Sequence, residues 1–391
     1  MRKVSLEMAV ETITHLTIKG FKSIRSLENF ELRRFNVLIG ANGVGKSNLI
    51  DFFWMLKLML GRSQGGLQLF IARKGGASSI LHYGSQITGF LDGIIRFSGE
   101  KQWSQYSFEL AWGAPDVLFY ASELLKYQSE IKDIKPHSKQ LGNGHFESKV
   151  LSLAVDKSDP ALNGIASVFR TRLRQVQVYH FNNTSETAKL RLSQDLDRED
   201  YLESNAGNLA VFLYNLKNNR PSHFKRILSN VKLIAPFIRD FVVEPQATND
   251  RFVLLRWMDR SGETFGPHQL SDGTIRAIAL ITALLQPDET MPSIMIFDEP
   301  ELGLHPAAIT LVASLLKAAS EKRQVIVATQ SPILIRDYDP EDVIVVERTE
   351  DELGRGESTF KRLEKDSLAA WLEDYDLGEL YEKNVTGGGP M

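Results

Sequence analysis

The segment Gly40–Ser47, GANGVGKS, decides the fold, because it matches the GxxxxGK[ST] pattern of a phosphate-binding loop. An apolar run, NVLI at 36–39, precedes the segment, and an apolar helical pattern at 47–60 follows it. A strand, a glycine-rich loop and a helix in this order are the context that confirms such a loop. Glycines allow backbone N–H groups to surround phosphate oxygens. The segment therefore predicts a nucleoside triphosphate site.

Two side chains of this loop have predicted roles of their own. Lys46 reaches the β- and γ-phosphates, and the hydroxyl of Ser47 is a ligand of Mg²⁺. ATP and Mg²⁺ are the expected cofactors, since a plain strand-to-helix turn would not need three glycines, a lysine and a serine in register. The predicted ATP-binding residues are Gly40, Ala41, Asn42, Gly43, Val44, Gly45, Lys46, Ser47 and Asn48.

A second apolar run, SIMIF at 293–297, is typical of a buried parallel strand and ends in two acids. Asp298 is predicted to hold the metal through its water shell, so the predicted metal ligands are Ser47 and Asp298. Glu299 is predicted to orient or deprotonate the attacking water. Two acids could also simply cap a strand, but their combination with the loop at 40–47 favours the catalytic interpretation.

The first part of the chain is predicted to form strands and one helix. Alternating runs over 12–39 predict strands before the loop, and short alternating runs from about 87 to 155 predict a mostly antiparallel β region. The polar stretch 182–200 predicts a loop or a mobile insertion. Further helices are predicted at about 159–174, 205–219 and 222–236.

The last third of the chain returns to alternating strands and helices. Strand-like runs at 240–245 and 251–258 are followed by a helix that starts near Ser271. The run at 293–297, a helix at about 306–320 and further strands then form a βαβ series. The predicted division is 1–158 for the first part of the ATPase core, 159–236 for a helical lobe and 237–391 for the second part of the core.

Composition excludes several classes of protein. The 391 residues are 43% hydrophobic and 24% charged, which is ordinary for a soluble globular protein. No cysteine is present, which excludes disulfides, thiolate metal sites and cysteine nucleophiles. We expect a cytoplasmic protein, because no apolar run approaches the ~20 residues of a membrane span and no secretion signal is recognisable. The net charge of −3 does not indicate a nucleic-acid-binding protein as a whole.

The stretch QLSDG at 269–273 starts its helix in an unusual way. Ser271 is a good N-cap, but Gly273 lies in the first turn, where glycine costs about 1 kcal/mol relative to alanine. Small residues and unpaired amides at a helix N-terminus suit an anion. These residues raise the question of which anion binds there.

Five motifs together carry a resemblance to a known family. The chain resembles the ABC-type ATPases of the RecF/SMC/OLD-like group, and more narrowly the compact bacterial predicted ATPases of the AAA_21 type. This resemblance implies an α/β fold, a P-loop NTPase of the ABC-ATPase type with a mixed sheet, an antiparallel β region and a helical lobe. The motifs are GFKSI (20–24), IGANGVGKSN (39–48), LSDGT (270–274), FDEPELGLHP (297–306) and ATQSP (328–332).

The resemblance also implies roles for single residues. LSDGT corresponds to the ABC signature, so Ser271, Asp272 and Gly273 would contact the γ-phosphate of ATP that a second subunit binds. The segment Glu301–His305 corresponds to the D-loop, and Gln330 lies where transport ATPases have the switch histidine. Glutamine can donate a hydrogen bond to the γ-phosphate, but it cannot take up a proton near neutral pH. The catalytic residues are thus expected to be Glu299, Lys46 and Gln330.

The Q-loop glutamine of that family cannot be assigned from the sequence. Gln86 lies at a plausible distance along the sequence from the phosphate-binding loop, but Gln64 and Gln68 are also candidates.

His305 is interpreted as the start of a helix or as a residue at the seam between two subunits, because no second metal ligand lies three or four residues further on.

The implied function is a nucleotide switch. A chain with one loop, one acid pair and one signature is expected to form a head-to-tail homodimer, or a higher even-numbered oligomer, around two Mg-ATP molecules and to hydrolyse ATP slowly. The resemblance implies a role in genome maintenance (DNA repair) or antiviral defence, with nucleic acid and a separate effector such as a nuclease as partners. The alternative is a regulatory or scaffold ATPase that signals to a protein partner without binding DNA. A membrane transporter is disfavoured, since LSGGQ and the switch histidine are both replaced.

Overall fold

The computed structural model describes residues 12–61, 65–98, 102–129, 137–155, 160–198 and 201–389. The chain divides into two compact units. Unit 1 comprises Met1–Gln177, Asp339–Ala370 and Lys383–Met391, and unit 2 comprises Val178–Tyr338 and Trp371–Glu382.

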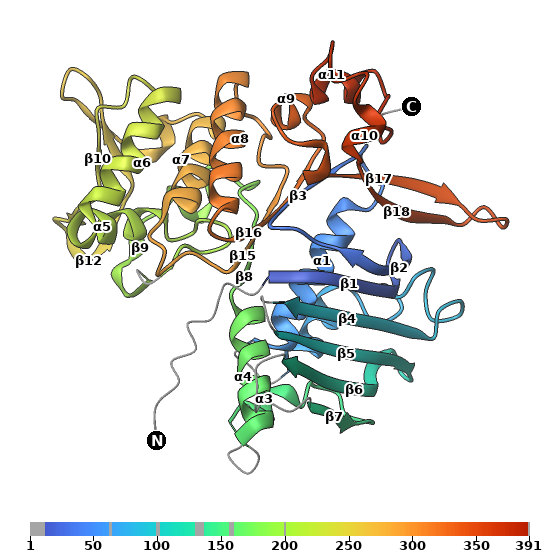
Figure 1. The fold of residues 1–391 in the computed structure, drawn as a ribbon. Helices are drawn as coiled ribbons and strands as arrows, with labels where there is room; N and C mark the ends of the chain where they lie inside the picture. Colours follow the sequence, from blue (N-terminus) through green and yellow to red (C-terminus); the bar gives the residue numbers. More distant parts are fainter. Residues whose placement is uncertain are drawn as a thin grey trace. The chain divides into compact units, whose positions relative to one another are not determined.

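Unit 1 contains the antiparallel β region that the sequence predicts. Its sheet has the strand order β2-β1-β4-β5-β6-β7, and every neighbouring pair is antiparallel (Figure 1, blue to teal). Side chains of β4 alternate between buried and mostly half-buried positions, because successive side chains of a strand point to opposite faces of the sheet. The strands are β1 (Thr12–Phe21), β2 (Ile24–Glu31), β4 (Phe90–Ser98), β5 (Gln102–Gly113), β6 (Val117–Ser129) and β7 (His137–Gly142).

Aromatic side chains join the helices of unit 1 to this sheet. Phe52 of α1 (Lys46–Met59) lies edge-on to Phe21 at 5.5 Å between ring centroids and stacks on Phe108 at 6.4 Å. Phe169 of α4 (Pro160–Arg174) lies edge-on to Phe97 at 5.5 Å. Unit 1 also contains α2 (Gly66–Arg73), which the sequence did not predict, together with α3 (Val150–Leu153) and α10 (Lys365–Leu368).

The strand before the phosphate-binding loop is β3 (Phe35–Ile39), whose five residues are all buried. It pairs in parallel with β17 (Val343–Glu350), and β17 pairs in antiparallel fashion with β18 (Gly356–Arg362). Residues from the end of the chain therefore flank the strand that leads into the loop.

In unit 2, β15 (Ile294–Asp298) and β16 (Gln324–Thr329) are parallel and almost completely buried, as the apolar run SIMIF predicts for β15. β8 (Val176–Tyr179) lies on the other side of β15, and the ring of Tyr179 stacks on Phe297 at 5.1 Å. The acids of the predicted site lie at the carboxyl end of β15, and its glutamine, Gln330, follows the carboxyl end of β16.

Four helices of unit 2 lie side by side in the order α5, α6, α7, α8 (Figure 1, green to orange). The predicted helices therefore exist, with ends that differ by a few residues. Their bounds are α5 (Leu209–Asn219), α6 (Pro221–Ile234), α7 (Asp272–Leu285) and α8 (Pro306–Ser320), and two short helices follow, α9 (Pro332–Ile335) and α11 (Leu377–Glu382).

Short strands and 3₁₀ turns complete the two units. Within 182–200, the loop that the sequence predicts contains two such turns and a short strand, and Thr184, Arg191 and Gln194 are buried. The remaining elements are β9 (Gln194–Asp195), β10 (Asp240–Val242), β11 (Pro245–Gln246), β12 (Asn249–Val253), β13 (Arg256–Met258), β14 (Thr264–Phe265), η1 (Lys189–Arg191), η2 (Leu196–Arg198), η3 (Pro267–Gln269) and η4 (Pro340–Asp342).

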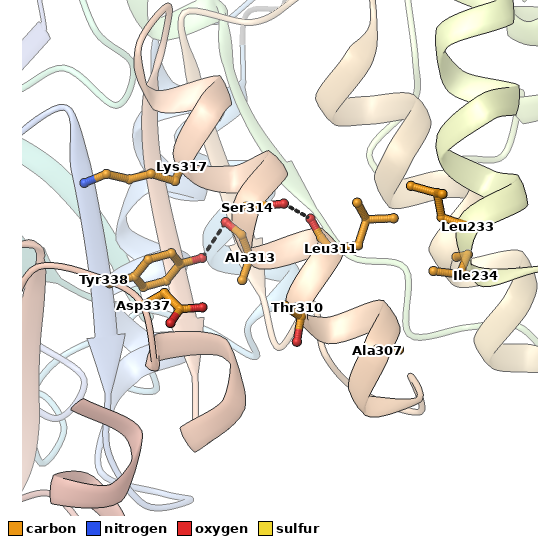
Figure 2. Close-up of a pocket in the computed structure, with 10 residues that line it drawn as sticks. All are labelled: Leu233, Ile234, Ala307, Thr310, Leu311, Ala313, Ser314, Lys317, Asp337 and Tyr338. Carbon is orange, nitrogen blue, oxygen red and sulfur yellow. Dashed lines mark hydrogen bonds between the residues drawn. The ribbon is translucent and has the colours of Figure 1, made fainter. Parts of the chain in front are cut away.

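A shallow apolar groove of about 570 Å³ follows α8, between the end of α6 and the segment after α9 (Figure 2). Leu233 and Leu311 are among its lining residues, together with the small side chains of Thr310 and Ser314. None of the predicted site residues lines this groove.

In the described parts of the chain, no helix has the length and hydropathy needed to cross a bilayer.

The contact of α1 with the sheet of unit 1 gives a stability prediction. Phe52 is fully buried between two aromatic rings, so Phe52→Ala should lower the free energy of unfolding by about 3–5 kcal/mol. Phe90→Ala is the control: Phe90 is 54% exposed, and its removal should change stability by no more than about 0.5 kcal/mol. Urea unfolding followed by circular dichroism measures both, and equal effects would contradict this packing.

Candidate functional site

The phosphate-binding loop of unit 1 is held in a shape that requires glycine. It leaves β3 after Ile39 and enters α1 at Lys46, with Gly45 as the N-cap at φ 111°, in the left-handed region. A Cβ at Gly45 would lie 2.0 Å from Oγ of Ser358 and 2.6 Å from Oγ of Ser23. Neither the backbone angle nor the space allows another residue at this position.

Lys46 lies over the loop rather than pointing into solvent. The residue is 5% exposed, and its Nζ donates to the carbonyl oxygens of Gly40 at 2.5 Å and Ala41 at 3.0 Å. A buried ammonium beside a glycine-rich turn at a helix N-terminus suits a phosphate group, because both the charge and the helix dipole favour an anion. The residues present therefore fit the triphosphate that the motif implies.

Two serines, Ser23 and Ser358, support the phosphate-binding loop, although neither was predicted as a site residue from the sequence. The hydroxyl of Ser358 in β18 donates to the carbonyl oxygen of Val44 at 2.5 Å, and its Oγ also lies 2.6 Å from Oγ of Ser23, within hydrogen-bonding distance. Asn48 donates to the same Ser23 hydroxyl at 2.6 Å. Ser23 belongs to the GFKSI motif, so that motif was the available signal; nothing in the sequence around Ser358 marks it.

In unit 2, the predicted catalytic carboxylate occupies a strained position. Glu299 follows β15 with φ 48°, a left-handed conformation that is uncommon for residues other than glycine. Its backbone N–H donates to the carbonyl oxygen of Ala328 at 2.8 Å, and its Oε1 accepts a hydrogen bond from Nε2 of Gln330 at 3.3 Å. Asp298, the last residue of β15, precedes it. The structure thus brings Glu299 and Gln330 together, and strain of this kind is concentrated at functional sites.

A third acid belongs to this cluster. Oε1 of Glu301 accepts hydrogen bonds from the hydroxyl of Thr329 at 2.6 Å and from the backbone N–H of Gln330 at 3.2 Å. Burial raises the pKa of Glu301 above its ordinary value, and the hydrogen bond from Thr329 only partly offsets this effect. From the sequence, Glu301 was expected only to belong to the D-loop segment. Its position two residues after Glu299 was the signal that could have placed it in the same cluster.

The signature segment has the predicted N-cap. Oγ of Ser271 accepts a hydrogen bond from the N–H of Thr274 at 3.2 Å, and both Ser271 and Asp272 are exposed. The structure gives a reason for Gly273 that the sequence did not: a Cβ there would lie 2.3 Å from the carbonyl oxygen of Gly303. Glycine is therefore required by a contact within unit 2, with or without a phosphate nearby.

The remaining candidates have structural roles. His305 is the N-cap of α8, and its Nδ1 accepts a hydrogen bond from the N–H of Ala307 at 3.3 Å, which confirms the helix-start interpretation. Gln68 donates to backbone carbonyls of unit 1, and Gln86 is exposed. Gln64 lies outside the described residues, so the Q-loop glutamine stays unassigned.

No cluster of three or more histidine or acidic side chains in the described part of the chain could hold a metal ion by itself. The predicted Mg²⁺ site does not need one, because Mg²⁺ is usually held by one or two protein oxygens, phosphate oxygens and water. Ser47 belongs to unit 1 and Asp298 to unit 2. Their assignment as ligands stays a prediction.

Three features together define a P-loop ATPase of ABC type. They are a glycine-rich loop between a buried strand and a helix, two acids at the end of a second buried strand, and a helix that starts with LSDGT. The chain belongs to the family described as "AAA domain, putative AbiEii toxin, Type IV TA system", whose model matches residues 35–336. A search of curated proteins found no match.

Solved structures of SMC heads share this fold. The chain is similar to the SmcHead bound to the C-winged helix domain of ScpA, with 18% identity, a TM-score of 0.55, and coverage of 90% of this chain and 99% of that chain. It is also similar to the Smc head domain with an extended coiled coil bound to the C-terminal domain of ScpA from Pyrococcus furiosus, with 14% identity, a TM-score of 0.52, and coverage of 93% and 99%. The family match and these folds confirm the RecF/SMC-like resemblance and the α/β class.

The raised pKa of Glu301 gives a prediction of pH dependence. Because the folded chain binds this proton more tightly than the unfolded chain, stability should fall as pH rises above the ordinary glutamate pKa of 4.5. Glu301→Gln removes this titration, so its stability relative to the wild type should increase over the same range.

Thermal unfolding measured from about pH 4, near the ordinary carboxyl pKa, up to about pH 8 gives this difference in stability. Glu289→Gln, on an exposed loop, is the matched control for the amide substitution. A stability difference for Glu301→Gln that does not change with pH would show that this carboxyl titrates normally.

Proposed function

We propose that this chain binds Mg-ATP through residues 40–48 and hydrolyses it slowly to ADP and phosphate. The observation that carries the proposal is the contact of Glu299 with Gln330 directly after two buried parallel strands. In this contact, the amide of Gln330 holds the carboxylate of Glu299 in one orientation. A residue that orients an attacking water must itself have a fixed orientation. The family match and the fit of Lys46 to a phosphate support it.

The proposed chemistry follows from these groups. Glu299 orients a water molecule and takes its proton as the water oxygen attacks the γ-phosphorus, and the bond from that phosphorus to the bridging oxygen of ADP breaks. Lys46 leaves the carbonyls of its own loop and binds phosphate oxygens. Gln330 donates a hydrogen bond to the γ-phosphate and couples its presence to Glu299. Ser47 and Asp298 would hold Mg²⁺, and its charge would offset that of the phosphates.

We propose further that two chains bind head to tail, or that larger even-numbered assemblies form. Ser271 and Asp272 are exposed at the N-terminus of α7, a 14-residue helix whose dipole favours an anion. Together with Gly273, they would contact the γ-phosphate that the second subunit binds. ATP would then stabilise the dimer, and loss of the γ-phosphate would release it.

The proposed setting is a DNA-related process in the cytoplasm, genome maintenance or antiviral defence, with a separate effector protein. The similar SMC heads were solved bound to parts of ScpA, which supports a protein partner. One observation favours the alternative, a regulatory ATPase that does not bind DNA: the basic residues Lys19, Lys22 and Arg25 each pair with a carboxylate. ATP turnover with and without DNA decides between them, because only the first role expects stimulation.

Lys46 gives a test of nucleotide binding. Lys46→Ala should weaken the binding of a fluorescent ATP analogue by about 10- to 100-fold, since it removes a charged hydrogen-bond donor to phosphate. Lys57→Ala is the control, because Lys57 lies in the last turn of the same helix and donates to Gln177. Equal affinities for the wild type and Lys46→Ala would contradict the assignment of the loop.

Glu299 and Ser271 give a test of the dimer. Glu299→Gln should keep ATP binding, stop hydrolysis and accumulate an ATP-bound dimer, which light scattering after size exclusion measures. Adding Ser271→Arg should abolish that dimer, because a large side chain would fill the space of the γ-phosphate. A Glu299→Gln protein that stays monomeric with saturating ATP would refute a dimer made by this chain alone.

A further inference from the structure

Arg191 is one of the most buried charged residues of unit 2, although it comes from the polar segment 182–200. Its side chain is 5% exposed, and it ends η1. Its Nε donates to the carbonyl oxygen of Thr184 at 2.7 Å, so the turn that carries it is closed on itself. The rest of the guanidinium points away from this turn.

The outer nitrogens of Arg191 hold the segment that starts α7. Nη1 donates to the carbonyl oxygens of Pro267 and, at 3.1 Å, of Leu270. Nη2 donates to the carboxylate of Asp272 at 2.7 Å. Because these acceptors lie on both sides of Ser271, one planar group determines where the signature turn sits.

A second arginine attaches the same polar segment to α7 at its other end. Nε of Arg276 donates to the carbonyl oxygen of Phe181 at 2.9 Å, and Nη2 donates to that of Asn182 at 3.3 Å. Its Nη1 donates to the carbonyl oxygen of Leu302. Segment 181–191, the start of α7 and the loop around Gly303 are therefore connected by two buried guanidinium groups.

The energetics of burial make these contacts specific. A buried guanidinium is stable only when its hydrogen bonds are made, and its loss leaves carbonyl oxygens without donors. Lysine cannot replace arginine here, because its single ammonium does not reproduce the planar fork that meets several acceptors at once. A surface loop with no further role would not need such an anchor.

We propose that Arg191 is a positioning residue that presets Ser271, Asp272 and Gly273 for a γ-phosphate bound by a second subunit. It does not touch the nucleotide itself. The inference rests on the proposed ATP-dependent dimer, but its structural part, that Arg191 orders the signature turn, holds for the chain alone.

Hydrogen exchange tests the structural part without nucleotide. In Arg191→Ala, the amides of residues 268–274 should exchange about tenfold faster, since charged hydrogen bonds are lost. Arg191→Lys should recover only part of the protection. Arg251→Ala is the matched control, because Arg251 also pairs with this polar region, through Asp195 and Asp197, but not with the signature. Unchanged exchange at 268–274 in Arg191→Ala would overturn the inference.

ATP turnover tests the functional part. Arg191→Ala should keep the wild-type affinity for ATP, because the loop at 40–48 is intact, and lose about 100-fold in kcat through misplaced signature groups. Mixing it with Lys46→Ala should restore about a quarter of the wild-type rate, because half of the dimers are then mixed and each has one intact site. Thermal unfolding midpoints show whether each variant is folded.

The outcomes separate the two proposals. A kcat within about twofold of the wild type, or a loss that mixing does not restore, would overturn a role of Arg191 toward a second subunit. If the wild type itself shows neither turnover nor ATP-dependent association, the proposed function fails, and the exchange experiment alone decides whether Arg191 orders the turn.

Discussion

Close backbone approach at two glycines is the constraint on which both halves of the predicted site depend. At Gly45, the phosphate-binding loop lies against two serine hydroxyls, and at Gly273 the start of α7 lies against the carbonyl of Gly303. A side chain at either position would push apart segments that are otherwise joined by hydrogen bonds. At both positions glycine therefore lets two segments approach closely, and this approach sets where the neighbouring side chains lie.

Buried charge is the second organising feature. Lys46 in unit 1 and Arg191 and Arg276 in unit 2 are all nearly inaccessible, and their hydrogen bonds go mainly to backbone carbonyl oxygens. Carbonyl acceptors satisfy a cation without neutralising it. A lysine held in this way can therefore exchange its carbonyls for phosphate oxygens, whereas the two arginines, each fixed by several acceptors on different segments, cannot move without disturbing the signature turn.

The sequence predicted what depends on local pattern. Alternation gave the antiparallel strands, continuous apolar runs gave β15 and β16, and the GANGVGKS motif placed the start of α1 correctly. It missed contacts between distant segments: Ser358 is an ordinary strand serine until it meets Val44, and Arg191 is an ordinary loop arginine until it meets Leu270. The division at 158 and 236 and the roles of the site residues stay predictions.

The support of Val44 by Ser358 has a consequence for synthesis of the chain. These residues are separated by 314 positions, and the neighbouring strand of β3 in unit 1, β17, begins only at Val343. The antiparallel sheet of unit 1 can form as soon as its own strands leave the ribosome. The contact that supports the phosphate-binding loop must wait until Ser358 has been synthesised, long after Val44. The supported shape of the phosphate-binding loop is therefore acquired only after β17 and β18 have been synthesised.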